Sequence, residues 1–385
     1  MKKLFLIPIL FLVAAVITAC NKEPAPEDRF SEYVDLWNEQ KFAEMYDYLS
    51  SKAQEKITKE EFVSRYEKIY SDLEVDNLSI QFNKPEEVET KEGKTTFPFS
   101  AKMDSIAGEI SFDHQSTMVK EERDDETNWY VNWDTTYIFP ELEEGETIGL
   151  STEPAKRGDI LDKNGESLAT TGTVYEIGIV PANMEGQESN IISKVADLLG
   201  MTTEQIEKQL NASWVQPEHF VPIKKISTDE TELLEKLFSI PSVVKRDVEG
   251  RVYPLGEAAS HLIGYVGPIT AEELEKHEGY TSTDVIGKRG LEQVFEEKLK
   301  GENGVKIFIN KKDGSEKIIA EKEVKHGEDV QLTIDASLQQ KIYSQFNGEP
   351  GTAAAIHPKT GETLALVSSP GFNPTTLSLG ATSEQ

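Results

Sequence analysis

The chain has 385 residues, of which 37% are hydrophobic and 28% are charged, and its formal net charge is −29. This length predicts two or three folded units, and the composition is that of a globular protein that buries apolar cores. Because a surface this acidic repels phosphates and anionic headgroups, the charge argues against nucleic-acid binding and against membrane attachment through basic residues.

A short leader that ends in a cysteine opens the sequence. Two lysines precede the apolar run 4–16, and Ile17-Thr-Ala-Cys20 places small residues directly before the cysteine. The run is too short for a convincing membrane-spanning helix, so it predicts a signal peptide over residues 1–20. It resembles a bacterial lipoprotein signal, in which Cys20 is acylated and becomes the mature N-terminus; the alternative is a free thiol near an ordinary cleavage site. Residues 21–28 follow as a polar, proline-containing tether.

Cys20 is the only cysteine of the chain, and this limits its chemistry. Without a second thiol no intrachain disulfide can form, and a thiolate metal site is excluded. The six histidines do not approach the spacing of zinc ligands. The sequence therefore predicts no metal site and no cofactor.

Between residues 29 and 140 the hydrophobic period changes from that of helices to that of strands. Apolar residues at helical spacing predict helices near 30–37 and 42–49, and Thr58 followed by Glu61 is a capping box for another helix. Alternating strand-like runs follow at 78–82, 110–112 and 129–133. This order predicts an α+β domain with a curved sheet wrapped on helices. Such a sheet could hold a small-molecule pocket, but the aromatic stripes favour a packed core.

An acidic linker is expected over residues 141–152, because its charges keep it solvated. In the second region, 153–312, Asn164-Gly165 predicts a type I′ hairpin turn, which needs positive φ at two residues. Helices are predicted over 202–210, over 227–238 and from Gly287 onward. The last of these helices is expected to present one apolar face, formed by Leu291, Val294, Phe295 and Leu299.

The third region, 313–385, contains strands, a helix capped by Asp335, and a hairpin whose turn is Pro358-Lys-Thr-Gly361. One helix and a few strands are too little to close a domain core. We therefore expect Gln385 to be a point of truncation.

Seven short segments follow one another across the second and third regions: Arg157-Gly-Asp-Ile-Leu-Asp162 with Asn164-Gly165, Tyr253-Pro-Leu-Gly256, Ser260-His-Leu-Ile-Gly-Tyr-Val-Gly267, Gly287-Lys-Arg-Gly-Leu-Glu292, Leu332-Thr-Ile-Asp335, His357-Pro-Lys-Thr-Gly-Glu362 and Pro370-Gly-Phe-Asn-Pro374. In this order they resemble the class B penicillin-binding proteins, specifically the low-affinity Gram-positive branch that contains the methicillin-resistance transpeptidase. The aromatic-rich first region resembles the membrane-proximal extension of that branch, which has a nuclear-transport-factor-2-like (NTF2-like) fold.

The resemblance implies an α+β multidomain protein with three folded parts. Residues 29–140 would form the NTF2-like domain, and residues 153–312 a mixed α/β pedestal, also called a dimerisation domain. Residues 313–385 would form the incomplete start of an α/β transpeptidase domain of the serine β-lactamase-like kind.

The resemblance also implies a cell-wall D,D-transpeptidase that crosslinks peptidoglycan stem peptides and could give β-lactam resistance. In the family a serine in Ser-x-x-Lys attacks D-Ala-D-Ala, Ser-x-Asn and Lys-Thr-Gly elements complete the site, and β-lactams acylate the same serine. The nucleophile is expected beyond Gln385, so no catalytic residue is expected in this chain, and the chain is expected to be inactive.

The resemblance implies stem peptides, β-lactams and cell-wall synthesis proteins as partners of the full-length protein, and a lipid bilayer as the partner of acylated Cys20. The expected location is the extracellular face of the cytoplasmic membrane of a Gram-positive bacterium. The alternative function is that of a non-enzymatic surface lipoprotein, whose NTF2-like domain binds a ligand or a partner.

Two strings imitate catalytic motifs, and we interpret neither as catalytic. Ser242-Val-Val-Lys245 matches Ser-x-x-Lys, but it follows a proline and precedes the catalytic part of the family. Lys359-Thr-Gly361 matches the substrate-binding strand motif, but it falls in a hairpin turn. Isolated histidines such as His261 lack a defensible carboxylate partner.

Arg157, Asp159 and Asp162 are the remaining candidates for a role in recognition or at an interface. An ion pair between Arg157 and one of these aspartates, which would fix the start of the second region, is the favoured reading.

Overall fold

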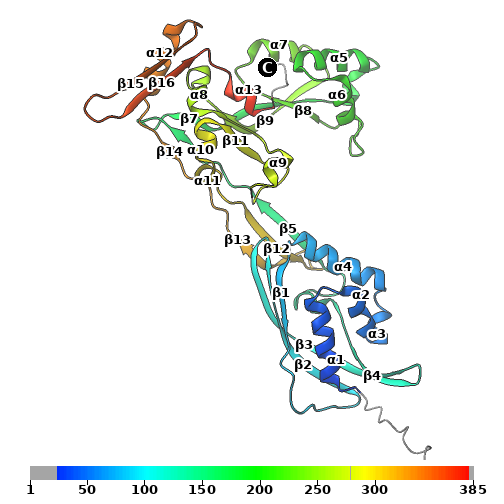
Figure 1. The fold of residues 1–385 in the computed structure, drawn as a ribbon. Coiled ribbons are helices and arrows are strands. Elements are labelled where there is room, and N and C mark those ends of the chain that lie inside the picture. The colour runs from blue at the N-terminus through cyan, green and yellow to red at the C-terminus, as the bar shows by residue number, and fades with distance from the viewer. Residues whose placement is uncertain (1–23, 278, 381–385) are drawn as a thin grey trace, which may run out of the picture. The chain divides into compact units, whose positions relative to one another are not determined.

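The computed structural model describes residues 24–277 and 279–380, and these fold into two compact units (Figure 1). One unit contains the chain up to Thr152 together with Gly304–Glu323, and the other contains Glu153–Asn303 together with the chain from Val324 onward. Each unit is therefore built from two stretches of chain. Among the described residues, no helix is long and apolar enough to cross a membrane.

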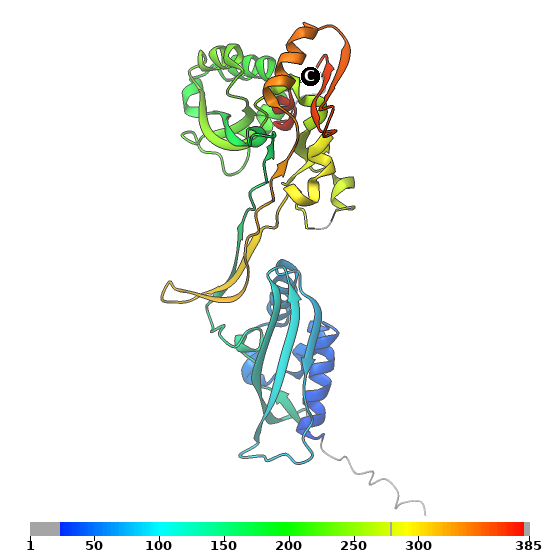
Figure 2. The ribbon, with the colours of Figure 1, turned by 90° about the vertical axis from the view of Figure 1, so that its left-hand side faces the viewer.

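The first unit packs helices on an antiparallel sheet (Figure 2). Its helices are α1 (Pro26–Asn38), α2 (Phe42–Met45), α3 (Ser51–Gln54) and α4 (Lys59–Asp72), with 3₁₀ turns η1 (Tyr46–Tyr48) and η2 (Thr135–Tyr137). Its main sheet has the order β1-β2-β3-β4, formed by β1 (Asp76–Gln81), β2 (Lys94–Ser105), β3 (Gly108–Arg123) and β4 (Glu126–Val131). This is the predicted α+β order, and the predicted capping box opens α4: Thr58 Oγ1 accepts from the Glu61 amide at 3.2 Å, and Glu61 Oε2 accepts from the Thr58 amide at 3.1 Å.

The aromatic side chains of the first unit form its core. Phe30, Tyr33 and Trp37 of α1 are fully buried, as is Tyr66 of α4. The indole of Trp37 donates a hydrogen bond to the hydroxyl of Tyr70 at 2.9 Å, which satisfies a buried polar group inside the cluster. The prediction that these aromatics pack inward is confirmed, because their side chains are buried in the hydrophobic core of the unit.

A second sheet of the first unit changes the expected division of the chain. Its order is β13-β12-β5, formed by β5 (Thr147–Glu153), β12 (Gly304–Asn310) and β13 (Glu316–Lys322). Part of the expected linker 141–152 is therefore a strand. The acidic residues before it are neutralised, since Glu146 lies 2.8 Å from Lys311. Ile307 and Ile309 of β12 are fully buried in the core of the first unit, so this hairpin belongs there, although the sequence placed residues 304–312 in the pedestal.

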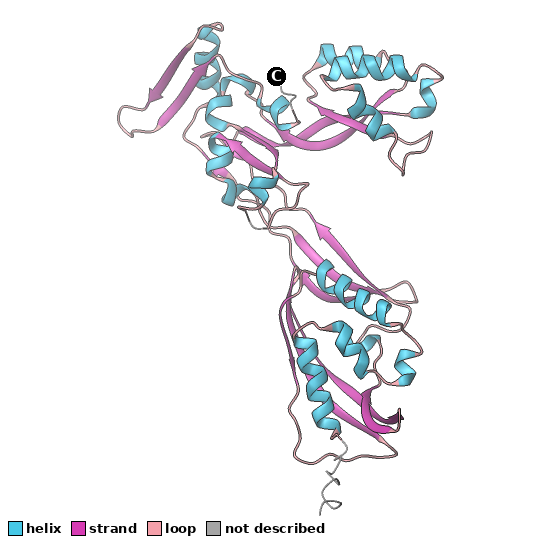
Figure 3. Cartoon of the chain, turned by 45° about the vertical axis from the view of Figure 1, so that its right-hand side comes forward, coloured by secondary structure: helices cyan, strands magenta, loops and turns pink. Residues whose placement is uncertain are grey.

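The second unit is built around the long strand β7 (Ser167–Ile179) (Figure 3). Strand β7 pairs antiparallel with β6 (Ile160–Leu161), β8 (Val221–Ile226) and β9 (Val243–Val252), and β14 (Val330–Gln331) pairs parallel with β6. A buried aliphatic cluster joins β7, β8 and the helices α5 (Glu188–Leu199), α6 (Thr203–Leu210) and α7 (Thr231–Phe238). A 3₁₀ turn, η3 (Pro181–Met184), leads from β7 toward α5.

The hairpin at Asn164-Gly165 is present, but its turn is not of type I′. Gly165 has φ of +86°, whereas Asn164 is not among the residues with positive φ. The buried carboxylate of Asp162 instead accepts hydrogen bonds from the amides of Asn164 and Glu166 at 2.6 and 3.0 Å. The side chain of Asp162 thus holds the loop through hydrogen bonds from its backbone amides. The preference of Asn-Gly for type I′ turns does not take such side-chain bonds into account.

The segment from Gly287 does not open one long helix. Residues 285–289 form β11, which pairs with β10 (Tyr265–Pro268), and the helical part is split into α10 (Gly290–Val294) and α11 (Glu296–Leu299). A Cβ on Gly287 would lie 2.2 Å from the carbonyl oxygen of Glu292, so the chain folds back tightly on itself. Val294, expected on the apolar face, is 72% exposed because the helix is interrupted at Phe295. The remaining short elements before this segment are η4 (Gly256–Ala258), α8 (Ser260–Ile263) and α9 (Ala271–Leu274).

The chain from Val324 onward packs in the second unit. It contains α12 (Ala336–Phe346), the antiparallel pair β15 (Gly351–Ile356) and β16 (Thr363–Ser369), and α13 (Pro374–Ser378). Asp335 caps α12 as predicted, since its side chain accepts a hydrogen bond from the Leu338 amide at 2.9 Å. Short helix α13 docks on the pedestal strands, where Thr375 Oγ1 accepts from the Tyr253 amide at 3.3 Å.

Candidate functional site

A buried ionic cluster brings together two of the ordered sequence segments, 157–162 and 287–292, with residues of β9 and α11. It consists of Arg157, Arg251, Glu292 and Glu296, and the side chain of Glu292 is completely buried. Arg157 precedes β6, Arg251 lies at the end of β9, and both glutamates lie one turn apart on α10 and α11. Residues separated by more than a hundred positions therefore meet at one point.

Glu292 is shared between the two arginines. Its Oε2 accepts from Arg157 Nε at 2.8 Å, and its Oε1 accepts from Arg251 Nε at 2.7 Å. Glu296 receives two further bonds from the Arg157 guanidinium, at 3.0 and 2.7 Å. The planar guanidinium of Arg157 thus engages both carboxylates, as suits its fixed fork of donors.

The electrostatics of the cluster favour the charged forms of Arg157 and Glu296. Burial by itself would lower the pKa of Arg157, but hydrogen bonds and charges from Glu296 and Glu292 outweigh it and raise that pKa. Burial would raise the pKa of Glu296, yet the hydrogen bond and charge of Arg157 leave that pKa below its ordinary value. The hydroxyl of Tyr280 and the amide of Gly287 also donate to Glu296, at 2.6 and 2.8 Å. The charges of Arg157, Glu292 and Glu296 are therefore paired and hydrogen-bonded, whereas Nη1 and Nη2 of Arg251 are buried without a hydrogen-bond partner.

Arg157 does not pair with either aspartate that the sequence offered. Asp159 accepts from Thr170 Oγ1 at 2.8 Å, and its Oδ1 lies 3.8 Å from Arg251 Nη1, too far for a hydrogen bond. The partners of Arg157 are Glu292 and Glu296, which the sequence analysis did not single out as site residues. Two glutamates four residues apart, on a segment with buried apolar neighbours, were the signal that could have found them.

Asp162 has a separate role that ties two parts of the second unit together. Besides the loop amides of Asn164 and Glu166, its carboxylate accepts the amide of Ala336 at 3.2 Å, at the first turn of α12. Burial would raise the pKa of Asp162, but the backbone donors Glu166, Ala336 and Asn164 outweigh it and lower that pKa. A single carboxylate thus anchors the helix to the hairpin.

The two strings that imitate catalytic motifs have no catalytic geometry. Ser242 is buried and directly precedes β9, and Lys245 lies within that strand and pairs with Asp247 at 3.0 Å. A serine and a lysine three positions apart share a face on a helix, but not on a strand. Lys359, Thr360 and Gly361 lie in the turn between β15 and β16, as predicted. Cys20 lies outside the described residues.

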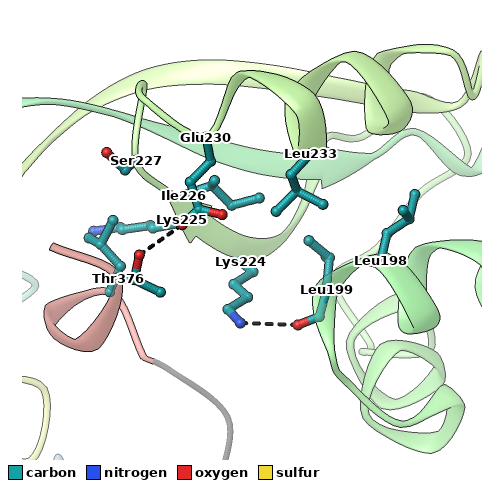
Figure 4. A pocket seen from close by; sticks show the side chains of 10 residues that line it. Leu198, Leu199, Lys224, Lys225, Ile226, Ser227, Glu230, Leu233 and Thr376 are labelled. Atoms are coloured by element: carbon teal, nitrogen blue, oxygen red, sulfur yellow. Dashed lines mark hydrogen bonds between the residues drawn. The ribbon is translucent and has the colours of Figure 1, made fainter. Parts of the chain in front are cut away.

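Figure 4 shows a recess of the second unit between β8, α7 and α13. Glu230 accepts a hydrogen bond from Thr376 Oγ1 at 2.8 Å, and Lys224 Nζ donates to the carbonyl of Leu199 at 3.1 Å. The space is about 20 Å³, enough for a water molecule but not for a substrate. This recess is therefore a packing junction that holds α13 against the pedestal.

A larger groove, of about 640 Å³, lies in the first unit between α4 and β5. Ile69, Leu142 and Ile148 contribute its apolar lining, and Lys56 and Glu144 form an ion pair of 3.2 Å at its edge. The volume is within the range of small-molecule sites. Two members of the core cluster, Leu73 and Trp133, form part of the groove's lining, so the groove borders the core.

Two family descriptions match the chain. "NTF2-like N-terminal transpeptidase domain" matches residues 25–146, and "Penicillin-binding Protein dimerisation domain" matches residues 152–332. The two matches support the resemblance to a class B penicillin-binding protein that was inferred from the ordered segments. The ionic cluster lies entirely inside the match to the dimerisation domain, and the first-unit groove lies mainly inside the match to the NTF2-like domain.

Curated relatives are similar over all or part of the chain. Penicillin-binding protein 3 of Bacillus subtilis is 39% identical over 97% of this chain and 56% of the relative. Peptidoglycan D,D-transpeptidase MrdA is 31% identical in Acinetobacter baumannii, over 59% of this chain and 34% of the relative, and 31% identical in Escherichia coli, over 57% and 36%. The chain thus spans little more than half the length of the first relative and about a third of the others.

The solved structures that are similar include a complex between Penicillin-Binding Protein (PBP2) and MreC from Helicobacter pylori. The identity is 22%, the TM-score is 0.44, and the match covers 62% of this chain and 45% of that chain. With this TM-score and identity, the similarity gives no information about the partners of this chain.

Proposed function

We propose that this chain is the spacer and pedestal portion of a peptidoglycan D,D-transpeptidase, and that the catalytic serine belongs to sequence beyond Gln385. The observation that carries the proposal is the 39% identity to penicillin-binding protein 3 of Bacillus subtilis over 97% of the chain, of which the chain covers only 56%. The ionic cluster supports the proposal. Arg157 and Glu292, which belong to the ordered segments, pair with each other inside the pedestal, and neither side chain is a nucleophile.

The complete protein would carry out acyl transfer in two steps. A serine hydroxyl attacks the penultimate carbonyl of a D-Ala-D-Ala stem peptide, forms an ester and releases the terminal D-Ala. The amine of a neighbouring stem peptide then attacks the ester, forms the crosslinking amide and frees the serine. In this scheme the described residues hold the catalytic domain in place, and α13 and the Asp162–α12 contact are its attachments to the pedestal.

Covalent labelling with a fluorescent penicillin tests the proposal. The protein expressed from the gene extended past Gln385 should be labelled, and the 385-residue chain should not. Labelling should persist in the extended protein when Ser242 is changed to alanine, because that serine is buried beside a strand. Covalent label on the 385-residue chain, or its loss in the Ser242→Ala variant, would contradict the proposal.

We further propose that the protein is a lipoprotein of the outer face of the cytoplasmic membrane, attached through acylated Cys20. The formal charge of −29 supports a covalent anchor, because so acidic a chain cannot adhere to anionic lipids by charge. Mass spectrometry should find two or more acyl chains on Cys20. A Cys20→Ser variant should leave the membrane fraction, and if it stays there the anchor is elsewhere.

We place the protein in the low-affinity branch as a proposal, supported by the NTF2-like domain at residues 25–146. Acylation of the extended protein by penicillin should then be slow and need high concentrations, and the gene should lower β-lactam susceptibility. Rapid acylation at low concentration would remove the protein from that branch. The alternative of a non-enzymatic binding lipoprotein is not favoured, because the curated relatives are named as penicillin-binding proteins and transpeptidases.

A further inference from the structure

Strand β5 lies at the edge of its sheet, and its outer backbone edge has no partner. The strand order is β13-β12-β5, so β5 pairs with β12 on one side only. Among the described residues, no backbone hydrogen bond outside the sheet involves residues 147–153. The amides and carbonyls along this outer edge are therefore free to pair with another extended segment.

The sequence of β5 does not protect this edge. Proteins commonly protect an edge strand with lysine, with proline, with a bulge or with a covering segment. Strand β5 reads Thr-Ile-Gly-Leu-Ser-Thr-Glu, without lysine or proline, and its Leu150 is 43% exposed. The strand thus combines an unpaired backbone edge with an exposed apolar side chain.

The free edge of β5 runs along the groove between α4 and β5. Every residue from Thr147 to Leu150 lines this groove. Because successive side chains of a strand point to opposite faces, a groove that contacted one face of β5 would be lined by every second residue. The unbroken run therefore places the backbone edge along the groove. The opposite wall is α4, which contributes the apolar side chains of Ile69 and Leu73.

One cation of the groove has no ion-pair partner. Lys56 and Lys68 each form an ion pair with a carboxylate of the groove. The Arg65 guanidinium forms no ion pair or hydrogen bond with the described residues, and it interacts with Glu61, one turn away, through charge at longer range. The carboxylates that line the groove are already engaged in ion pairs or as helix caps: Glu61, Asp72, Asp134, Glu144 and Glu146. Arg65 is thus the positive charge that the groove offers to a carboxylate from outside.

We propose that the groove between α4 and β5 binds an extended polypeptide segment of a partner protein, which adds to β5 as a further strand. The main chain of the segment pairs with the free edge of β5, and its alternate apolar side chains cover Leu150 and contact Ile69. A carboxylate of the segment pairs with Arg65. A second copy of this chain is a poorer occupant, because two chains of formal charge −29 repel each other.

Calorimetric titration of the 385-residue chain with the capped peptide Thr-Val-Thr-Val-Glu-Val-Thr tests the site. We expect saturable binding, and hydrogen exchange of the β5 amides should slow in the complex because the edge amides become bonded. Leu150→Ser should weaken binding by about tenfold, and Arg65→Gln by about two- to fivefold. Leu366→Ser is the matched control: this leucine is 46% exposed, lies in the second unit, and should leave binding unchanged.

The same peptide with every backbone amide N-methylated separates strand addition from simple adhesion. It keeps the side chains but cannot donate hydrogen bonds to β5, so it should not bind. Absence of saturable binding of the first peptide, or equal affinity of the N-methylated one, would overturn the proposal. Equal affinities of Leu150→Ser and Leu366→Ser for the first peptide would overturn it too. A dimer that sedimentation detects and that Leu150→Ser abolishes would identify a second copy of this chain as the occupant instead.

Discussion

The carboxylate of Glu292 lies between two guanidinium groups that are themselves buried. The Arg157 side chain is 11% exposed, that of Arg251 is 5% exposed, and that of Glu292 is 0% exposed. A buried ion pair gains little over an apolar pair of the same shape, because desolvation offsets the attraction. Removing Glu292 is different, since Arg251 then remains buried and charged without its carboxylate and Arg157 loses one of its two. The cluster therefore makes the fold depend on the exact residue at each position.

Changing Glu292 to glutamine should destabilise the second unit by about 3–5 kcal/mol, because two buried arginines lose their shared anion. Hydrogen exchange of β7 amides measured across a urea series would give this free energy. Glu272→Gln is the matched control: its pair with Lys276 is exposed, and we expect a change of about 0.5 kcal/mol or less. Equal effects of the two changes would show that the buried cluster adds no stability.

Asp162 makes the stability of the second unit depend on pH. Because its pKa is lowered on folding from the ordinary value of 3.8, its contribution is complete above that pH and is lost as the pH falls through the lower folded pKa. Asp162→Asn should cost about 1–3 kcal/mol near pH 7, since an amide nitrogen would face backbone donors. The difference between the two proteins should shrink below pH 3.8 in acid unfolding experiments. A difference that stays constant with pH would contradict this role.

At the scale of elements, the short connections of the second unit depend on two glycines that contact each other. Gly264 has φ of +76° and a Cβ there would lie 1.8 Å from the carbonyl oxygen of Arg289. Gly290 has φ of +63° and faces Gly264 across the same contact. The end of α8 and the start of α10 can approach this closely only because neither residue has a side chain.

Gly264→Ala should lower the free energy of unfolding by about 3 kcal/mol or more, because it combines positive φ with a backbone clash. Gly165→Ala is a control in the same unit, with φ of +86° and no atom within 4 Å of the added Cβ. That change should cost only about 1–2 kcal/mol of backbone strain. Thermal unfolding of both variants would measure the difference, and equal costs would mean that the contact with Arg289 relaxes freely.

At the scale of the whole molecule, the chain enters the first unit twice. Strand β12 comes from the last quarter of the sequence and buries Val305, Ile307 and Ile309 in a core whose other fully buried members precede residue 150. The path of the chain therefore leaves the first unit, builds most of the second, returns with β12 and β13, and leaves again. Stability of the first unit should depend on residues about 150 positions away.

Ile307→Ala should destabilise the first unit by about 2–4 kcal/mol through the cavity it leaves. Hydrogen exchange should become faster in α4 and stay unchanged in α5. Ile177→Ala, an equally buried residue of the second unit, should have the opposite pattern. Faster exchange in α5 of the Ile307 variant would show that the hairpin belongs to the second unit instead.

The sequence by itself determined the features that depend on contacts between neighbouring residues and on the spacing of hydrophobic residues. The capping box at Thr58, the cap at Asp335 and the change from helical to strand spacing in the first unit are set by neighbours within a few residues, and the structure contains them. The order of short segments was enough to suggest a resemblance to the family that the domain matches support.

Only the tertiary structure decided what depends on distant partners. The assignment of β12 to the first unit, the pairing of Arg157 with Glu292 and Glu296, and the exposure of Val294 all follow from where remote parts of the chain meet. The charge pattern and the hydrophobic periodicity are properties of one segment at a time. They could therefore suggest only the nearby Asp159 and Asp162 as partners for Arg157. Packing decides which carboxylate pairs with a buried arginine. The arginine loses its hydration on folding, so it pairs with the carboxylate that the fold buries next to it.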